Sequence, residues 1–169
     1  MALCDLLLRL AEEPALYRPL WSERILTEMT KVLKTKLHRS SEEVAWRRQQ
    51  MQEAFPEAMV TVPSALLKAV ECIPDKNDRH VLAAAIVAHA NTIITQNSRH
   101  FPKECCEKYG VVCQKPDDFL IDQYHLRPQL VLDKLDDQAA GISQNREFVV
   151  ASLKASVPKF CQLVDAGAM

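Results

Sequence analysis

The chain has 169 residues, and its 21 Lys and Arg residues against 22 Asp and Glu residues leave a formal net charge of −1 at pH 7. Hydrophobic residues make up 48% and charged residues 25%, which excludes a disordered or collagen-like protein and predicts one globular domain with a substantial core. The even charge balance argues against a protein that coats DNA without regard to sequence, but it leaves room for a local nucleic-acid site.

No apolar stretch approaches the ~20 residues that a membrane-spanning helix needs. The apolar start of the chain carries Asp5 and Arg9 and lacks a basic leader region and a small-residue cleavage site, which argues against a signal peptide. We therefore expect a cytoplasmic protein with no membrane contact, whose six cysteines stay reduced and pack as small side chains. The three glycines are too few for a phosphate-binding loop or a dinucleotide-binding fingerprint.

The first part of the chain is predicted to be helical. One helix is expected over residues 2–13, and a second from Ser22 to Leu37, with Ser22 as its N-cap. A third is expected from Ser41 to Phe55, with Ser41 as its N-cap, because apolar residues recur on one face at helical spacing.

The middle of the chain changes period and predicts an α/β arrangement. Short β-type runs occupy 58–62, 92–95 and 111–113, and helices are expected at 78–89 and 102–109 between them. Strands that alternate with helices pair in parallel, so we expect a helix-rich α/β fold with one short parallel sheet.

The tail returns to helical patterning. A helix is predicted over 116–126, a second carries an apolar stripe from Val131 to Ile142, and a last stripe must kink or restart at Pro158. These helices are interpreted as an extension packed on the domain, with a partner-binding arm as the alternative.

Polar residues follow two of the predicted strand and turn segments. Ligands of parallel α/β sheets lie beyond the carboxyl ends of the strands, so we expect Asp75, Asp78, Thr95 and Asn97 to converge there. The alternative is structural: Asp75 and Asn77 cap the helix, and Asp78 stabilises its positive end.

Glu28 lies at the margin of the apolar stripe of its helix, where a carboxylate is half-sheltered. This position favours a role for Glu28 in the same site. The alternative is a solvated carboxylate, or one paired with Lys31.

Three segments together resemble the motifs of a known family. They are SERILTE (22–28), DKNDRHVLAAA (75–85) and IITQNSRHFP (93–102), and they are similar to PIN-domain nucleases, in particular the VapC-like toxin branch. The resemblance covers about residues 2–121. It implies a three-layer α/β/α nuclease domain over 1–121, followed by a helical extension over 122–169.

The resemblance also implies an activity. Members of the family cleave single-stranded RNA with Mg²⁺ or Mn²⁺ held by acidic residues, and VapC-like members are toxins of bacterial type II toxin–antitoxin pairs. By this resemblance Glu28, Asp78 and Asn97 are catalytic, and with Asp75 they bind the metal. The partners implied are single-stranded RNA and a cognate antitoxin protein.

Basic groups near these acids are candidates for binding RNA phosphates. Arg79 and Arg99 are assigned to substrate binding, together with Thr95 from the family's T-x-D/N element; solvated surface charge is the alternative. Further basic side chains in the same motifs are Lys76, His80 and His100.

The start of the chain departs from the family pattern. The family opens with a central strand carrying a D-x-N motif, and Asp5 follows one helix too late to replace its acid. We therefore expect weak activity from the chain as it starts at Met1, and a homodimer that covers the exposed sheet edge. The rival reading is a truncated or degenerate PIN domain that binds RNA or an antitoxin without cleavage.

Overall fold

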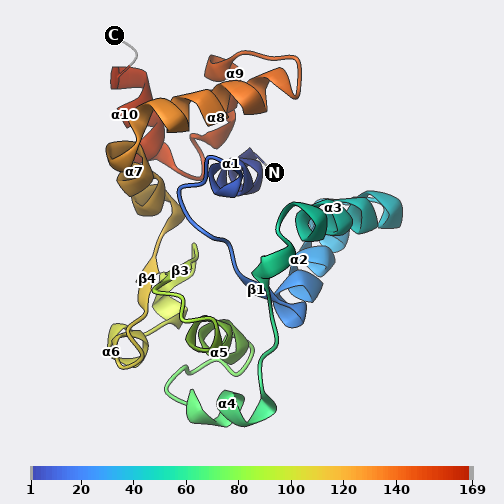
Figure 1. The fold of residues 1–169 in the computed structure, drawn as a ribbon, viewed down its shortest axis with the longest axis vertical. Helices are drawn as coiled ribbons and strands as arrows, with labels where there is room; N and C mark the ends of the chain where they lie inside the picture. The colour runs from blue at the N-terminus through green and yellow to red at the C-terminus, as the bar shows by residue number, and fades with distance from the viewer. Residues whose placement is uncertain (1, 168–169) are drawn as a thin grey trace. The chain divides into compact units, whose positions relative to one another are not determined.

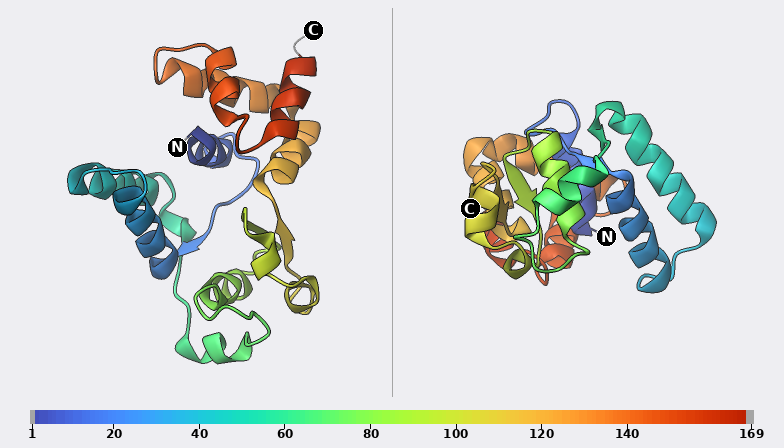
Figure 2. Two further views of the ribbon diagram at one scale, coloured as in Figure 1. Left: turned by 180° about the vertical axis from the view of Figure 1, so that it is seen from behind. Right: turned by 90° about the horizontal axis from the view of Figure 1, so that it is seen from below.

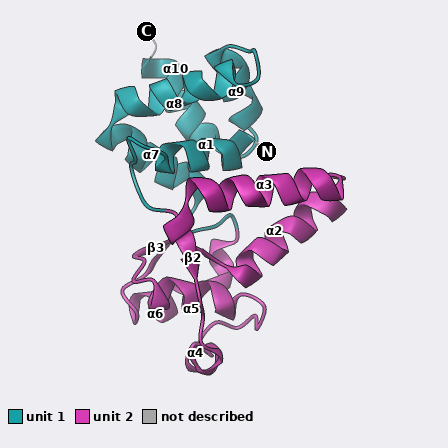
Figure 3. Cartoon of the chain, turned by 45° about the vertical axis from the view of Figure 1, so that its right-hand side comes forward, with its two compact units in different colours: residues 1–18, 94–96, 114–169 teal, residues 19–93, 97–113 magenta. Residues whose placement is uncertain are grey.

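The computed structural model describes residues 2–167, which separate into two compact units (Figure 3). Unit 1 takes in residues 1–18, 94–96 and 114–169, and unit 2 takes in 19–93 and 97–113. Within the described residues, no helix is both long and apolar enough to cross a lipid bilayer.

Unit 1 is built of helices, and α8 and α9 lie beside α1 within it (Figure 1). Its helices are α1 (Ala2–Ala11), α7 (Pro116–Leu126), α8 (Pro128–Ala140), α9 (Arg146–Leu153) and α10 (Pro158–Gly167). A new helix begins at Pro158, as the sequence predicts, because proline is accommodated in the first turn and not in a helix interior.

The core of unit 1 joins the first helix to the last four. Leu6 and Leu10 of α1 are completely buried in the same apolar cluster as Leu135, Leu153 and Phe160. Burial of these side chains stabilises the unit by removing apolar surface from water. The N-terminal helix is therefore part of the same body as the C-terminal helices.

Unit 2 opens with a strand and a helical hairpin. Its first elements are β1 (Trp21–Ser22), α2 (Glu23–Thr35), α3 (Ser41–Ala54), the 3₁₀ turn η1 (Pro56–Ala58) and β2 (Met59–Val60). Both views of Figure 2 show α2 and α3 side by side, and an ion pair between Arg48 and Glu23 at 2.6 Å links the two helices.

Side-chain caps start both helices of the hairpin. Ser22 caps α2 as predicted, with its Oγ accepting from Ile25 N at 3.4 Å. The cap of α3 is Ser40, so the assignment to Ser41 is wrong by one residue. Ser40 is the cap because it forms a capping box with Glu43, in which the side chain of each residue accepts a hydrogen bond from the backbone N–H of the other.

The chain between β2 and α7 contains the strands of a second small sheet. Its elements are α4 (Ser64–Ala69), α5 (Arg79–Val87), β3 (Thr92–Ile94), the 3₁₀ turn η2 (Ser98–His100), α6 (Lys103–Glu107) and β4 (Val112–Gln114). All of them belong to unit 2 except the last residues of the two strands, Ile94 and Gln114, which are counted with unit 1. Phe101 is 5% exposed in the apolar core of unit 2.

The strands form two sheets of two strands each, where the sequence predicts one sheet. The strand expected within 58–62 is β2, and it pairs in parallel with β1, so that Trp21 lies opposite Met59. The sequence predicts no strand at β1, whose Ser22 was expected only as a helix cap. β3 pairs with β4, and Val112 N donates to Asn91 O while Thr95 N donates to Gln114 O, a parallel progression. The α/β class with short parallel strands is confirmed.

Packing explains why β1 escaped prediction. A two-residue strand is too short to show the alternation by which strands are found in a sequence. Its place depends on Trp21, which is 6% exposed and meets the Phe55 ring edge-to-face at 5.8 Å between centroids.

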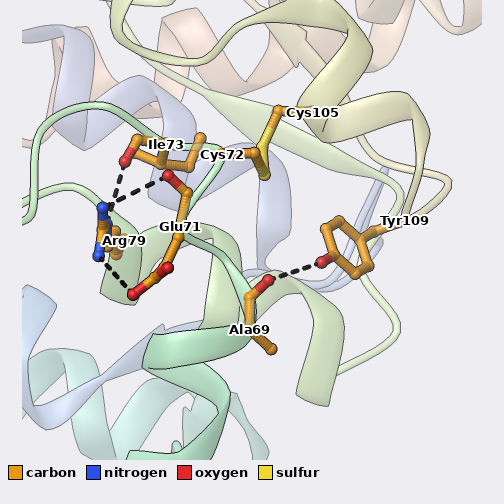
Figure 4. The surroundings of a disulfide bond; sticks show 7 residues. All are labelled: Ala69, Glu71, Cys72, Ile73, Arg79, Cys105 and Tyr109. Atoms are coloured by element: carbon orange, nitrogen blue, oxygen red, sulfur yellow. Dashed lines mark hydrogen bonds and ion pairs between the residues drawn. A yellow bond between two sulfur atoms is a disulfide. The ribbon is translucent and has the colours of Figure 1, made fainter.

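A disulfide joins Cys72 and Cys105, which are 33 residues apart in the chain (Figure 4). The expectation that all six cysteines are reduced is wrong for this pair, because sequence spacing does not reveal which side chains meet in the fold. The bond ties the segment before α5 to α6, and Tyr109 Oη donates to Ala69 O at 3.0 Å beside it. The other four cysteines are free.

We predict that reduction of this disulfide lowers the melting temperature. Opening a loop of this length removes an entropic restraint on the unfolded chain, which by loop-closure theory is worth roughly 3–4 kcal/mol. Differential scanning calorimetry with and without a phosphine reductant, and on Cys72→Ser with Cys105→Ser, measures the change. Cys4→Ser, at a free and half-buried cysteine, is the control. An unchanged melting temperature after reduction would contradict the cross-link.

Candidate functional site

The turn that leads into α5 contains the first two acidic residues of the site. Asp75 Oδ1 accepts a hydrogen bond from Asn77 N at 2.8 Å, so part of the structural alternative holds for Asp75. Asp78 occupies the N-cap position of α5, yet its side chain makes no capping hydrogen bond. The Asp78 carboxylate is therefore available for another interaction.

That interaction is with His100. Asp78 Oδ2 lies 2.8 Å from His100 Nδ1, and the two side chains are 26% and 33% exposed. The ligand atoms of Asp75, Asp78 and His100 all lie within 4.8 Å of one another. We call these three residues the acid–histidine cluster.

The chemistry of this donor set fits a divalent cation. Two carboxylates supply oxygen ligands and negative charge, and the imidazole supplies a nitrogen ligand that suits transition metals. Asp75 is exposed, which leaves the cluster open to ions from solvent. The acid–histidine cluster is therefore a candidate metal centre.

Glu28, which lies on α2, contacts a second histidine, His80 of α5. Its Oε1 lies 3.0 Å from His80 Nε2 and 3.5 Å from Arg24 Nε, and the second of these contacts is an ion pair. The carboxylate is 50% exposed, and it contacts these two groups in place of Lys31, the partner suggested from sequence.

His80 lies among the candidate acids. Its side chain is 2% exposed, and neither Nδ1 nor Nε2 has a hydrogen-bond partner within the described part of the chain. Burial lowers the pKa of His80, an effect that the charges of Glu28 and Asp78 partly oppose. The charges of Glu28, on α2, and of Asp78, at the N-cap of α5, thus both favour the protonated form of this buried imidazole.

The other residues expected at the site have separate positions. Asn97 begins the η2 turn, where its backbone oxygen accepts from His100 N at 2.9 Å. Thr95 belongs to unit 1, and its N–H donates to Gln114 O. The structure therefore groups Asp75 with Asp78 and sets Asn97 in the same turn as His100.

The two arginines expected to bind phosphates differ. Arg79 donates from Nε to Ile73 O at 3.0 Å and from Nη2 to Glu71 O at 3.3 Å, and its side chain is 17% exposed (Figure 4). These bonds hold the segment immediately before Asp75. Arg99, on η2, is exposed.

The contacts of the two histidines with the acids were not predicted from the sequence. His80 and His100 were expected only as basic groups near the acids, because nothing in a single sequence reveals which acid each imidazole contacts. The one usable signal was position: both lie within motif segments that carry candidate acids.

Comparison with known proteins identifies the family. The PIN domain model matches residues 3–99, well over half of the 169 residues. The chain belongs to the PIN domain family. Over 49 residues it is 49% identical to a protein of Mycobacterium tuberculosis (strain ATCC 25618 / H37Rv) named "Putative ribonuclease VapC50". The resemblance to the VapC-like branch is confirmed.

The extent of this likeness is limited to part of each protein. The aligned segment is 29% of this chain and 29% of the VapC50 relative, so the chain spans less than a third of that relative's length. No solved structure matches the chain. Asp75, Asp78, Glu28 and Asn97 all fall inside the stretch that the PIN domain model matches.

We predict that Mn²⁺ raises the melting temperature of the chelator-treated protein. A ligand that binds only the folded state adds ~2.7 kcal/mol of stability at a free concentration ~100 times its Kd. Asp78→Asn should remove most of this shift, because it removes one ligand and one negative charge. The matched control is Asp133→Asn, on the exposed face of α8 in unit 1. A full Mn²⁺ shift in Asp78→Asn would contradict a metal centre at this cluster.

Proposed function

We propose that the protein is a metal-dependent endoribonuclease that cleaves single-stranded RNA and is the toxin of a bacterial type II toxin–antitoxin pair. The observation that carries the proposal is the acid–histidine cluster, whose two aspartates lie within the residues matched by the PIN domain model. The name of the partial relative, a ribonuclease, supports RNA as the substrate. Residues 1–121 are proposed as the nuclease domain and 122–169 as its helical extension.

In this proposal Glu28, Asp78 and Asn97 are the catalytic residues, and with Asp75 they hold Mg²⁺ or Mn²⁺. A bound divalent cation supplies an activated water and offsets charge on the scissile phosphodiester. The protein's own contribution is to orient the carboxylates. His100 contacts Asp78, and Arg24 and His80 contact Glu28, which restricts the rotamers of both acids.

Substrate binding is proposed for Arg79, Arg99 and Thr95. Arg99 is exposed on the turn that carries His100 and is suited to pair with an RNA phosphate. Arg79 already binds two backbone carbonyls, so it contributes by holding the Asp75 segment in place.

Binding without cleavage is the second candidate function, and one observation favours it. Both Glu28 and Asp78 are paired with cationic groups or imidazoles, and these partners compete with a metal ion for the carboxylates. A degenerate PIN domain of this kind would bind RNA or an antitoxin and leave the RNA intact.

The experiment that separates the two is cleavage of a fluorescent single-stranded RNA with Mg²⁺ or Mn²⁺, followed on denaturing gels. We expect cleavage that a chelator stops. Asp78→Asn should slow it by more than roughly 100-fold, because removal of even an outer partner of a metal ligand costs about 10- to 100-fold. Asp133→Asn should cleave normally. RNA that is bound but stays intact under every condition would reject the nuclease in favour of the binding module.

The proposed partners are a cognate antitoxin protein in the cytoplasm and a second copy of the chain. Each described sheet has only two strands, so every strand has one edge without a strand neighbour among the described residues. We predict a homodimer with twice the chain mass of 19.1 kDa. Light scattering over a concentration series measures the mass. A monomer at all concentrations contradicts the dimer and leaves the nuclease proposal standing.

A further inference from the structure

We infer that His100 is itself a metal ligand and gives the site a preference for Mn²⁺ and related transition metals over Mg²⁺. This inference rests on the proposed function, since it specifies which ion the nuclease uses. It goes beyond the set of Glu28, Asp75, Asp78 and Asn97, all of which offer oxygen atoms.

The fold places His100 at the cluster independently of Asp78. Its backbone N–H donates to Asn97 O at 2.9 Å, which closes the η2 turn. The next residue, Phe101, is 5% exposed in the core of unit 2 and anchors the turn from the other side. The imidazole is thereby presented to the acids by a short turn that is fixed at both ends.

A covalent bond holds together the two segments that carry the ligands. Cys72 lies three residues before Asp75, and Cys105 lies five residues after His100. Their disulfide, with the Arg79 bonds to Ile73 O and Glu71 O, restricts how far the Asp75 segment can move from the His100 segment. A preorganised donor set of this kind binds an ion without first ordering the chain.

The type of donor atom decides which ion is preferred. Mg²⁺ takes oxygen ligands and gains little from an imidazole, whereas imidazole nitrogen is a good ligand for first-row transition metals. His100 Nδ1 lies 2.8 Å from Asp78 Oδ2, and the cluster's ligand atoms lie within 4.8 Å of one another. One ion can therefore meet two oxygens and one nitrogen.

A second imidazole lies beside Glu28, outside the acid–histidine cluster. His80 is 2% exposed, its Nε2 lies 3.0 Å from Glu28 Oε1, and neither ring nitrogen has a hydrogen-bond partner within the described residues. The candidate acids are thus accompanied by two histidines from separate elements, α5 and η2.

The simpler alternative is that His100 only positions the Asp78 carboxylate and does not bind the ion. Loss of a positioning residue would weaken Mg²⁺ and Mn²⁺ equally, because both ions use the same carboxylate. Loss of a nitrogen ligand would weaken Mn²⁺ selectively. The ratio of the two affinities therefore separates the roles.

The experiment measures metal alone on the full chain after chelator treatment, with Mn²⁺ followed by electron paramagnetic resonance and Mg²⁺ by competition. His100→Ala should weaken Mn²⁺ binding at least about tenfold and Mg²⁺ binding less than about twofold. His100→Asp, which supplies an oxygen ligand, should bind Mg²⁺ at least as well as the wild-type chain while the preference for Mn²⁺ stays lost. Nitrogen hyperfine coupling to bound Mn²⁺ should diminish in both variants.

His89→Asn is the matched control. His89 is exposed just beyond the other end of α5, and its φ of 52° is a conformation that asparagine tolerates. Both affinities and the nitrogen coupling should be unchanged. Circular dichroism checks that each variant folds, and His100→Asp keeps the test valid if His100→Ala unfolds.

The outcomes distinguish this inference from the proposed function. Equal weakening of both metals in His100→Ala, or unchanged nitrogen coupling, overturns the inference, while loss of binding in Asp78→Asn leaves the metal site of the proposed nuclease standing. Failure of the wild-type chain to bind either metal overturns both.

Discussion

The contact between Asp78 and His100 is the interaction on which the candidate site depends. A residue at the start of a helix normally caps it, and a capping aspartate would be turned back to its own backbone. Asp78 instead leaves α5 uncapped and directs a carboxylate oxygen to His100, 2.8 Å away. The helix gives up one capping bond, and the protein gains a carboxylate fixed at the positive end of α5.

Neighbouring bonds hold in place the two short segments that carry the ligands, the turn with Asp75 and the η2 turn with His100. Arg79, the first residue of α5, donates hydrogen bonds to the carbonyls of Glu71 and Ile73, and these bonds hold the segment that leads to Asp75 against the helix. The disulfide at Cys72 adds a covalent restraint between this segment and α6. Loop residues become dependable ligands only when such bonds limit their motion, because metal geometry tolerates displacements of a fraction of an ångström.

The two histidines change how this member of the PIN domain family is interpreted. A site of acidic residues alone binds a hard cation such as Mg²⁺, and the sequence motifs predict only such a site. With His80 beside Glu28 and His100 beside Asp78, each principal acid has an imidazole next to it. Such neighbours either orient a carboxylate or bind the ion themselves, and in both cases they set affinity and selectivity around the same acids.

Local sequence patterns were enough to predict the helices, the Ser22 cap, the restart at Pro158 and the family, because these depend on contacts within about one helical turn or on contiguous motifs. It misplaced the cap of α3 by one residue, where two adjacent serines compete and the capping-box partner decides. Only the tertiary structure decided the pairing of Trp21 with Met59, the bond between Cys72 and Cys105, and the meeting of Asp78 with His100. Residues 22 to 38 positions apart meet through packing of the whole core, and no local pattern encodes that choice.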